Sequence, residues 1–398
     1  MRSTTLLFWM FASISAVACS GGSGSGFGKD GGGGGGGGDG GGGGGGDSGC
    51  PFCGIDGSAS DGGGGGGGCN PNPLNYDIPG NNCDDDGDGT VDNPQGACDQ
   101  GLAQTGPASD FAKAMGLCQT ADATHWGVVS ATYTQGYNST NAPDAHQHGI
   151  QPKFGTNVTA RQGSALGILS SGYAQNMDSC PGNTTGQDKG FSSCRMTGAG
   201  TPPPGYPKAA QGCPGSTVAN DVSAVTLKIK VPANAQGFAF DFNFFSGEWP
   251  EYVCTNFNDS FVAWLTSSAW QGKSNDFNIS FDGNGNPVSV NNGFFDVCSP
   301  AGLQCPSMPS ASTCKLGATE LAGTGFFISG DNQCGQTDSG GGATGWLTTQ
   351  APVAPGETIT LQLMIWDTGD QIYDSSVLLD NWSWAPSATT VSTNRPPN

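Results

Sequence analysis

Positively charged residues are scarce in this sequence. Lysine and arginine together number 13 in 398 residues, whereas aspartate and glutamate number 33, so the formal net charge is −20. The 13 basic residues form no cluster. Attraction to nucleic acid or to anionic lipid headgroups depends on such clusters, so both kinds of partner are excluded as charge-driven ligands.

Long apolar segments and common catalytic signatures are missing as well. Beyond the N-terminal segment, no apolar stretch reaches the 18 or more residues of a membrane-spanning helix. The motifs H-E-x-x-H and G-x-S-x-G do not occur, so the usual hydrolase signatures are absent. The sequence therefore predicts a protein that is not an enzyme.

The N-terminus has the pattern of a lipoprotein signal peptide, residues 1–18. Arg2 is followed by an apolar run from Leu6 to Val17, and Cys19 comes directly after Ala18. The run is too short to span a bilayer. We expect lipidation of Cys19 and, in a Gram-negative cell, attachment to the outer membrane, facing either the surface or the periplasm. The alternative is an ordinary signal peptide that leaves Cys19 as a thiol.

Residues 19–69 are dominated by glycine. Such a segment buries too little apolar surface to offset its ordering entropy, so it is predicted to be a disordered, flexible tether. Within it, Cys50 and Cys53 have the spacing of a redox motif but lack the strand and helix that lower a thiol pKa. We therefore expect a small local disulfide there.

The segment 70–98 contains an acidic loop, NNCDDDGDGTVDN at residues 81–93. Its oxygen-bearing residues have the D-x-D-x-D-G-x-x-D spacing that wraps ligands around calcium. The loop resembles those of thrombospondin type 3 repeats and dockerins, although Gln95 stands where an EF-hand has a bidentate glutamate. A solvated acidic turn is the alternative. The predicted calcium ligands are Asp84, Asp86, Asp88, Thr90 and Asp92.

Fifteen cysteines indicate an oxidising compartment. If Cys19 carries lipid, fourteen remain, which permits up to seven disulfides. Cys83 and Cys98 bracket the acidic loop, and a bond between them is one expected pairing.

Residues 99–388 show the pattern of a β domain. Aromatic and polar residues alternate with a period of two from Phe238 to Phe244, and a second strand is predicted from Ser260 to Leu265. Short strands and Gly/Asn/Pro turns favour a mainly β, antiparallel, jelly-roll-like sandwich with disulfide-pinned loops. The simplest arrangement pairs these two strands directly. The tail 389–398 is expected to be disordered.

Carboxylates gather near these strands, and three interpretations are open. The first is a calcium site, because adjacent carboxylates repel unless a cation neutralises them. The second is a glycosidase-like pair, Glu248 and Glu251. The third is hydrogen bonding of the acids to turn backbone. For the metal interpretation the candidate ligands are Glu248, Asp367, Asp370 and Asp374.

Two motifs resemble the choice-of-anchor L family of bacterial surface domains. They are FFSGEWPEYV at residues 244–253, continued by FNDSF at 257–261, and IWDTGDQIYDSSVLLD at 365–380. The chain departs from the family in having Gly247-Glu248-Trp249 where two glutamates and a tyrosine are common. The resemblance covers residues 102–385 and implies a cell-surface architecture without an assigned reaction.

The combined expectation is a lipid-anchored surface protein whose domain binds or adheres without catalysis and is stabilised by calcium. Its partner would be an extracellular protein or a polysaccharide. The alternatives are a lectin-like carbohydrate-binding module or a glycoside hydrolase with paired acids. Exposed tryptophans would favour the lectin, whereas core tryptophans would not. The aromatic residues in question are Trp249, Tyr252, Trp264, Trp366, Trp382 and Trp384.

Overall fold

A computed structural model describes residues 69–93, 96–174, 196, 198–291, 293–331, 334 and 338–396. The predicted signal peptide, Cys19, the Cys50–Cys53 pair and the tether up to residue 68 lie outside these ranges. No helix in the described ranges is long and apolar enough to cross a membrane.

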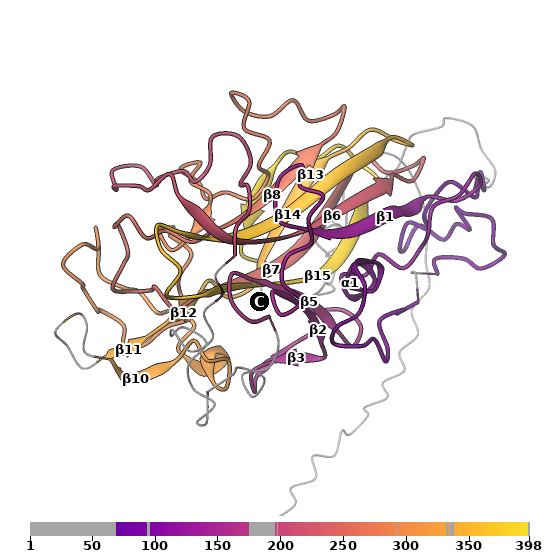
Figure 1. The fold of residues 1–398 in the computed structure, drawn as a ribbon. Helices are drawn as coiled ribbons and strands as arrows, with labels where there is room; N and C mark the ends of the chain where they lie inside the picture. Colours follow the sequence, from indigo (N-terminus) through magenta and orange to yellow (C-terminus); the bar gives the residue numbers. More distant parts are fainter. Residues whose placement is uncertain are drawn as a thin grey trace, which may run out of the picture. The chain divides into compact units, whose positions relative to one another are not determined.

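Two antiparallel sheets form the body of the protein, and Figure 1 shows them as facing layers. The five-stranded sheet has the order β1 (Gly127–Thr134), β6 (Ala219–Lys230), β14 (Thr358–Thr368), β8 (Ser260–Thr266), β9 (Val288–Ser289). The seven-stranded sheet has the order β16 (Ser392–Asn394), β13 (Leu347–Pro352), β7 (Gly237–Ser246), β15 (Ser375–Ala385), β5 (Leu166–Ser170), β2 (His148–Gln151), with β12 (Gly342–Ala343) also on β7. The predicted antiparallel β-sandwich is confirmed.

Smaller elements surround the two sheets. The α-helix α1 (Ala108–Ala114) contacts β1, β2 and β5, so it covers the side of the sandwich where an edge strand of each sheet lies. A short 3₁₀ helix is η3 (Thr319–Leu321). Two hairpin-like pairs are β3 (Lys153–Phe154) with β4 (Val158–Thr159), and β10 (Ile328–Asp331) with β11 (Asp338–Gly340).

Strand β7 is buried on both faces. Its alternate residues Phe238, Phe240, Phe242 and Phe244 all belong to the main core between the sheets. The residues between them point to the opposite face, because side chains alternate along a strand. There Phe245 joins a second apolar cluster with Phe154, Phe326 and others, while Asp241 and Asn243 are buried polar residues.

The predicted pairing of Phe238–Phe244 with Ser260–Leu265 is wrong. Strand β7 pairs with β13 and β15, and β8 pairs with β14 and β9 in the other sheet. The acidic connection at residues 247–259 therefore crosses from one sheet to the other. Alternation shows which face of a strand is buried, but it does not choose between a neighbour in the same sheet and one across the core.

The tail is also more ordered than predicted. Residues 392–394 form β16 on the edge of β13, with Thr393 buried and its hydroxyl 2.8 Å from that of Thr349. A polar sequence gains order here because an open strand edge offers backbone hydrogen-bond partners.

Five disulfides are present among the described residues. The expected Cys83–Cys98 bond is wrong, because these two cysteines bond to residues outside the acidic loop and thereby fasten the loop to the segments that precede and follow it. The pairs are Cys69–Cys83, Cys98–Cys118, Cys213–Cys254, Cys298–Cys314 and Cys305–Cys334.

Most of the aromatic residues considered for a sugar platform belong to the core. Each of five tryptophans is less than 9% exposed, so these cannot offer a stacking face to solvent; they are Trp249, Trp264, Trp366, Trp382 and Trp384.

Phe242 tests the packing of this core. Its ring centroid lies 5.0 Å from that of Phe261 in the opposite sheet, and its side chain is fully buried. We expect Phe242→Ala to lower the free energy of unfolding by about 3–5 kcal/mol, since it leaves a cavity. The control Val129→Ala, at a half-exposed position of β1, should change it by less than about 0.5 kcal/mol. The two variants are compared with their disulfides intact. Equal urea midpoints would contradict the assignment of Phe242 to the core.

Candidate metal centres

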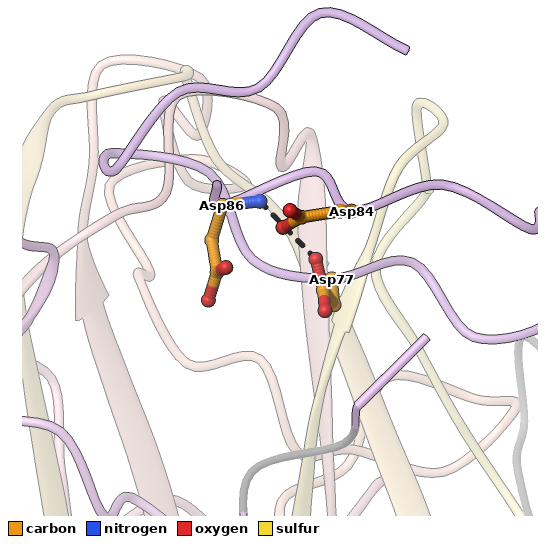
Figure 2. Close-up of side chains that lie close together, drawn as sticks. All are labelled: Asp77, Asp84 and Asp86. Carbon is orange, nitrogen blue, oxygen red and sulfur yellow. Dashed lines mark hydrogen bonds between the residues drawn. The ribbon is translucent and has the colours of Figure 1, made fainter. Parts of the chain in front are cut away.

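The acidic loop brings three carboxylates together, and one of them was not predicted. Asp84 and Asp86 meet Asp77, and one carboxylate oxygen of each lies within 4.8 Å of the others (Figure 2). Asp77 is 7% exposed and accepts hydrogen bonds from the backbone N–H groups of Asp85 (2.7 Å) and Asp86 (3.1 Å). It lies before the D-x-D-x-D pattern, so spacing alone could not find it.

The other predicted ligands of this loop lie outside that cluster. Asp88 accepts hydrogen bonds from the Thr90 backbone N–H (2.7 Å) and the Asn93 amide (2.7 Å), and Asp92 accepts from backbone N–H groups at residues 81 and 82. These contacts match the turn interpretation. Burial and the neighbouring acids raise the pKa of Asp86, whereas the Asn93 hydrogen bond lowers that of Asp88.

A second cluster is completely buried. It consists of Glu248, Asp259 and Asp367, each no more than 1% exposed and each with a carboxylate oxygen within 4.8 Å of the others. Glu248 lies just after β7 of the seven-stranded sheet. Asp259 directly precedes β8, and Asp367 is the second-last residue of β14. Strands β8 and β14 belong to the five-stranded sheet. The cluster, which we call the buried acidic centre, thus lies where the ends of both sheets meet.

The three carboxylates differ in how their oxygens are satisfied. Asp259 accepts hydrogen bonds from the Thr368 backbone N–H (2.9 Å) and the Ser375 hydroxyl (2.7 Å). Glu248 accepts one from the Asp259 backbone N–H (3.3 Å). Neither oxygen of Asp367 receives a hydrogen bond from a donor group of the described residues. Such a buried acid is costly unless a proton or a cation neutralises it.

Burial and mutual repulsion shift the titration of all three acids. Burial raises the pKa of Asp259 to about 7. Burial, followed by the charge of Asp259, raises the pKa of Glu248 well above its usual value. Asp367 is raised in the same way by burial and then by Asp259 and Glu248. At neutral pH the centre therefore favours either bound protons or a bound cation over three free negative charges.

The structure brings two of the four acids predicted as ligands into one cluster. Glu248 and Asp367 are in the centre, and Asp370 and Asp374 act on Asp367 electrostatically from nearby. Asp259 was missed as a candidate ligand. Asp259 directly precedes β8, which lies beside β14, the strand that carries Asp367. The sequence could have indicated this acid only if β8 had been assigned to the same sheet as β14. In the cluster, the carboxylate neighbours of Glu248 are Asp259 and Asp367, and Glu251 is not among them.

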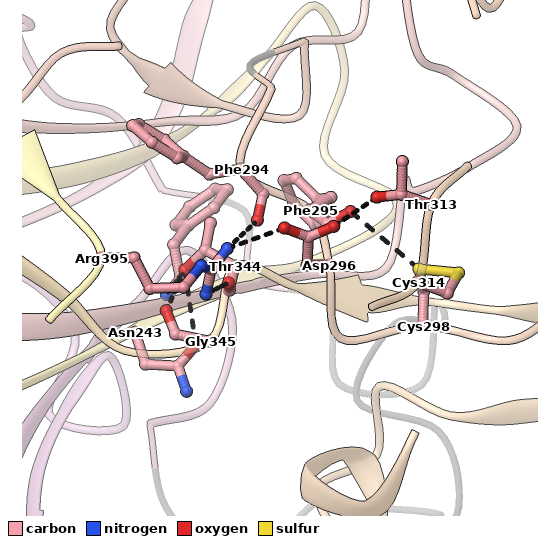
Figure 3. A network of polar contacts seen from close by, with 11 residues as sticks. Asn243, Phe294, Phe295, Asp296, Cys298, Thr313, Cys314, Thr344, Gly345 and Arg395 are labelled. Carbon is pink, nitrogen blue, oxygen red and sulfur yellow. Dashed lines mark hydrogen bonds and ion pairs between the residues drawn. A yellow bond between two sulfur atoms is a disulfide. The ribbon is translucent and has the colours of Figure 1, made fainter. Parts of the chain in front are cut away.

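A third polar network has a structural role. The Arg395 guanidinium contacts the Asp296 carboxylate at 3.1 Å and donates to the carbonyls of Phe294 and Thr344 (Figure 3). Asp296 also accepts a hydrogen bond from the Thr313 hydroxyl. Because its single acid is neutralised by arginine, this network has no need of a cation. It fastens the tail after β16 to the loop that carries the Cys298–Cys314 disulfide.

Comparison with known proteins gives one match. The family model of the choice-of-anchor L domain matches residues 127–385, from β1 to β15, and includes the buried acidic centre but not the Asp77–Asp84–Asp86 cluster. No curated protein and no solved structure matches the chain. Since the match spans more than half of the sequence, the protein belongs to the choice-of-anchor L domain family, which is not an enzyme family and whose domain indicates association with the cell surface or envelope.

Proposed function

We propose that this protein is a lipid-anchored, non-catalytic binding or adhesion domain of the outer membrane, and that calcium at the buried acidic centre stabilises it. The observation that carries the calcium proposal is Asp367, which is buried beside two other acids and receives no hydrogen bond at either oxygen from the part of the chain that the structure describes. Family membership supports the surface location and the absence of catalysis.

The ligand chemistry favours calcium over other common metals. The centre offers only oxygen atoms, whereas zinc and copper sites in proteins use histidine or cysteine. Calcium accepts six to eight oxygens in flexible geometry, while magnesium requires a near-ideal octahedron and retains several waters. A fully buried centre suits the ion that gives up its water more readily. Asp370 and Asp374 would add negative charge around it.

A cation at this position would join the two sheets. Glu248 follows β7 and Asp374 precedes β15, and these strands are neighbours in the seven-stranded sheet. Asp259 directly precedes β8 and Asp367 is in β14, and these strands are neighbours in the five-stranded sheet. One bound ion would therefore replace repulsion between the strand ends by attraction. The resulting stability is the expected contribution of calcium to a surface domain.

We extend the proposal to the acidic loop as a second, more exposed calcium site. Asp77, Asp84 and Asp86 are its core, and Asp88, Thr90 and Asp92 follow the calcium-loop spacing without joining the cluster. Most of these carboxylates already accept backbone hydrogen bonds, so this site needs the cation less than the buried centre does.

The surface location follows from the N-terminal sequence. Lipid on Cys19 would hold the chain in the membrane, and the glycine-rich segment would let the β domain stand away from it. A net charge of −20 keeps such a domain soluble and away from anionic headgroups.

Calcium binding can be tested with Asp367→Asn. For the wild type we expect free calcium at 100 times its Kd to stabilise the fold by about 2.7 kcal/mol relative to chelator, which raises Tm by several degrees. The variant should lose the response that arises from the buried centre. In chelator at pH 8 it should be more stable than the wild type, because it removes a buried negative charge.

Asp144→Asn is the matched control, because Asp144 is an exposed acid outside both clusters. It should keep the full calcium response. Absence of any calcium effect on the wild-type Tm would contradict the proposal, and so would an unchanged effect in Asp367→Asn.

The pH dependence of the metal-free protein gives a separate prediction. Asp259, Glu248 and Asp367 all have a pKa raised above the unfolded value of about 4. The folded state therefore binds protons that the unfolded state has released, and the share of the stability that comes from Asp259 is lost as pH rises through its folded pKa of about 7.

In chelator we thus expect the free energy of unfolding to fall by a few kcal/mol between pH 5 and pH 8, as an order of magnitude. Calcium should oppose this fall, since it replaces the protons, and its stabilisation should be larger at pH 8. Urea unfolding at the two pH values with and without calcium measures both effects. A metal-free stability that is flat or rises over this range would rule out the titration assigned to the centre.

Membrane attachment is tested with Cys19→Ser in the native host. The wild type should remain with the membrane fraction after washing with high salt and should need detergent for release. The variant should appear in the soluble fraction, whereas the control Cys50→Ser should stay with the membrane. Identical fractionation of the wild type and Cys19→Ser would exclude a lipid anchor at this residue.

A further inference from the structure

A polar pocket of about 460 Å³ lies on the face of β7 that points away from the main core. It is placed there by hydrogen bonds from Arg161 and Asn381 to Asp241, and from Asn243 to Glu320. Asp241 and Asn243 alternate with the core phenylalanines of β7. The lining residues are Asn157, Val158, Thr159, Ala160, Arg161, Glu320, Trp346 and Asn381.

We propose that this pocket binds a neutral pyranose unit of a polysaccharide. This inference builds on the proposed binding function and names its ligand class. The volume lies in the range of small-molecule sites, and a few directed polar groups surround one aromatic ring.

Trp346 supplies the surface on which a sugar ring can stack. Unlike the five core tryptophans, it is only partly buried, and it lies just before β13 at the pocket wall. The Arg161 guanidinium lies 5.9 Å from its ring centroid and so fixes the indole on one side. An indole offers a flat apolar body, which suits the C–H face of a pyranose.

The polar side chains around this ring are held in place, and among the described residues they keep hydrogen-bonding groups without a partner. Asn157 donates to the carbonyl of Thr319 (2.8 Å), which leaves its own amide oxygen as an acceptor. Asn381 donates to Asp241 (2.9 Å) and likewise keeps its oxygen. Arg161 uses Nε toward Asp241 (2.9 Å) and retains its terminal N–H groups. Donors and acceptors together match hydroxyl groups, each of which can donate and accept.

The charge balance argues against an anionic ligand. Arg161 is already paired with the buried Asp241, and Glu320 adds a further negative charge to the lining. Asp380 lies behind the pocket, where it accepts hydrogen bonds from the backbone N–H groups of Arg161 (2.6 Å) and Gln162 (3.2 Å). Among the described residues of the lining, a phosphate, sulfate or uronate would meet no uncompensated positive charge, whereas a neutral sugar needs none.

The side chains that form the pocket are held by hydrogen bonds to buried groups of the sheet. Asp241 is 1% exposed and also accepts a hydrogen bond from the Thr348 hydroxyl (2.5 Å). Asn381 has a φ of +55°, at the point where the β15 register shifts between Asp380 and Ser383. Such an irregularity redirects a side chain from the sheet and is costly for a non-glycine residue. On the other side, Asn243 continues through Thr344 into the Arg395 network (Figure 3).

The test is binding of neutral oligosaccharides to the purified, calcium-loaded full chain. The probes are hexasaccharides of glucose, mannose, galactose, xylose and N-acetylglucosamine, screened on an array and then measured by titration calorimetry. We expect at least one to bind, and we expect Trp346→Ala and Asn381→Ala each to weaken it at least tenfold. Trp346→Phe should retain part of the affinity, because it keeps an aromatic face.

Trp270→Ala is the matched control, since Trp270 is also partly buried but lies outside the pocket lining. Its affinity should equal that of the wild type, and melting curves establish that all variants are folded. Failure of every neutral probe to bind would overturn the proposal. Binding that is unchanged in folded Trp346→Ala, or that is confined to anionic glycans, would do the same. The calcium and membrane-anchor measurements do not involve the pocket. A negative result in the sugar-binding test would therefore not bear on the proposed calcium site or lipid anchor.

Discussion

Three carboxylates buried between the ends of two sheets are the constraint on which the structure most depends. Each sheet supplies acids at this end, since Glu248 follows β7, whereas Asp259 precedes β8 and Asp367 is in β14. Closing the sandwich brings like charges together in a place that water cannot reach. At neutral pH the fold is therefore stable only if bound protons or a bound cation neutralise the acids. Its stability consequently depends on pH and on the concentration of that cation.

Strand β7 connects this centre to the rest of the molecule. One face carries the phenylalanines of the core, and the other carries Asp241 and Asn243. Those two residues anchor the pocket side chains Arg161 and Glu320, and the strand then leads directly into Glu248. A single strand thus positions the core, the pocket and the buried centre. Disturbance of its register would be felt at all three, because a shift of one residue exchanges the two faces.

The sequence predicted local structure well and tertiary neighbours poorly. Period-two alternation located β7 and β8 to within two residues at each end. It could not tell that they lie in different sheets, because both have a face that requires an opposing layer. The same limit explains the two missed acids. Asp77 and Asp259 join their clusters through contacts that the ligand spacing does not encode, whereas Asp84 and Asp86 are neighbours by spacing alone. Disulfide partners and the edge pairing of β16 depend on tertiary contacts in the same way.

Two glycines in and next to β5, Gly167 and Gly172, are required by the side chains that pack against them. The run GSALGILSSG at residues 163–172 contains β5 and consists mostly of small residues, and the structure gives the reason at two positions. A Cβ on Gly167 would lie 2.6 Å from the Phe111 ring, so this glycine lets α1 approach β5 closely. A Cβ on Gly172 would lie 2.0 Å from an Asp374 oxygen, so it leaves room for an acid beside the buried centre. Small residues in this part of the chain are therefore required by what packs against them, and the space at Gly172 allows negative charge to gather around Asp367.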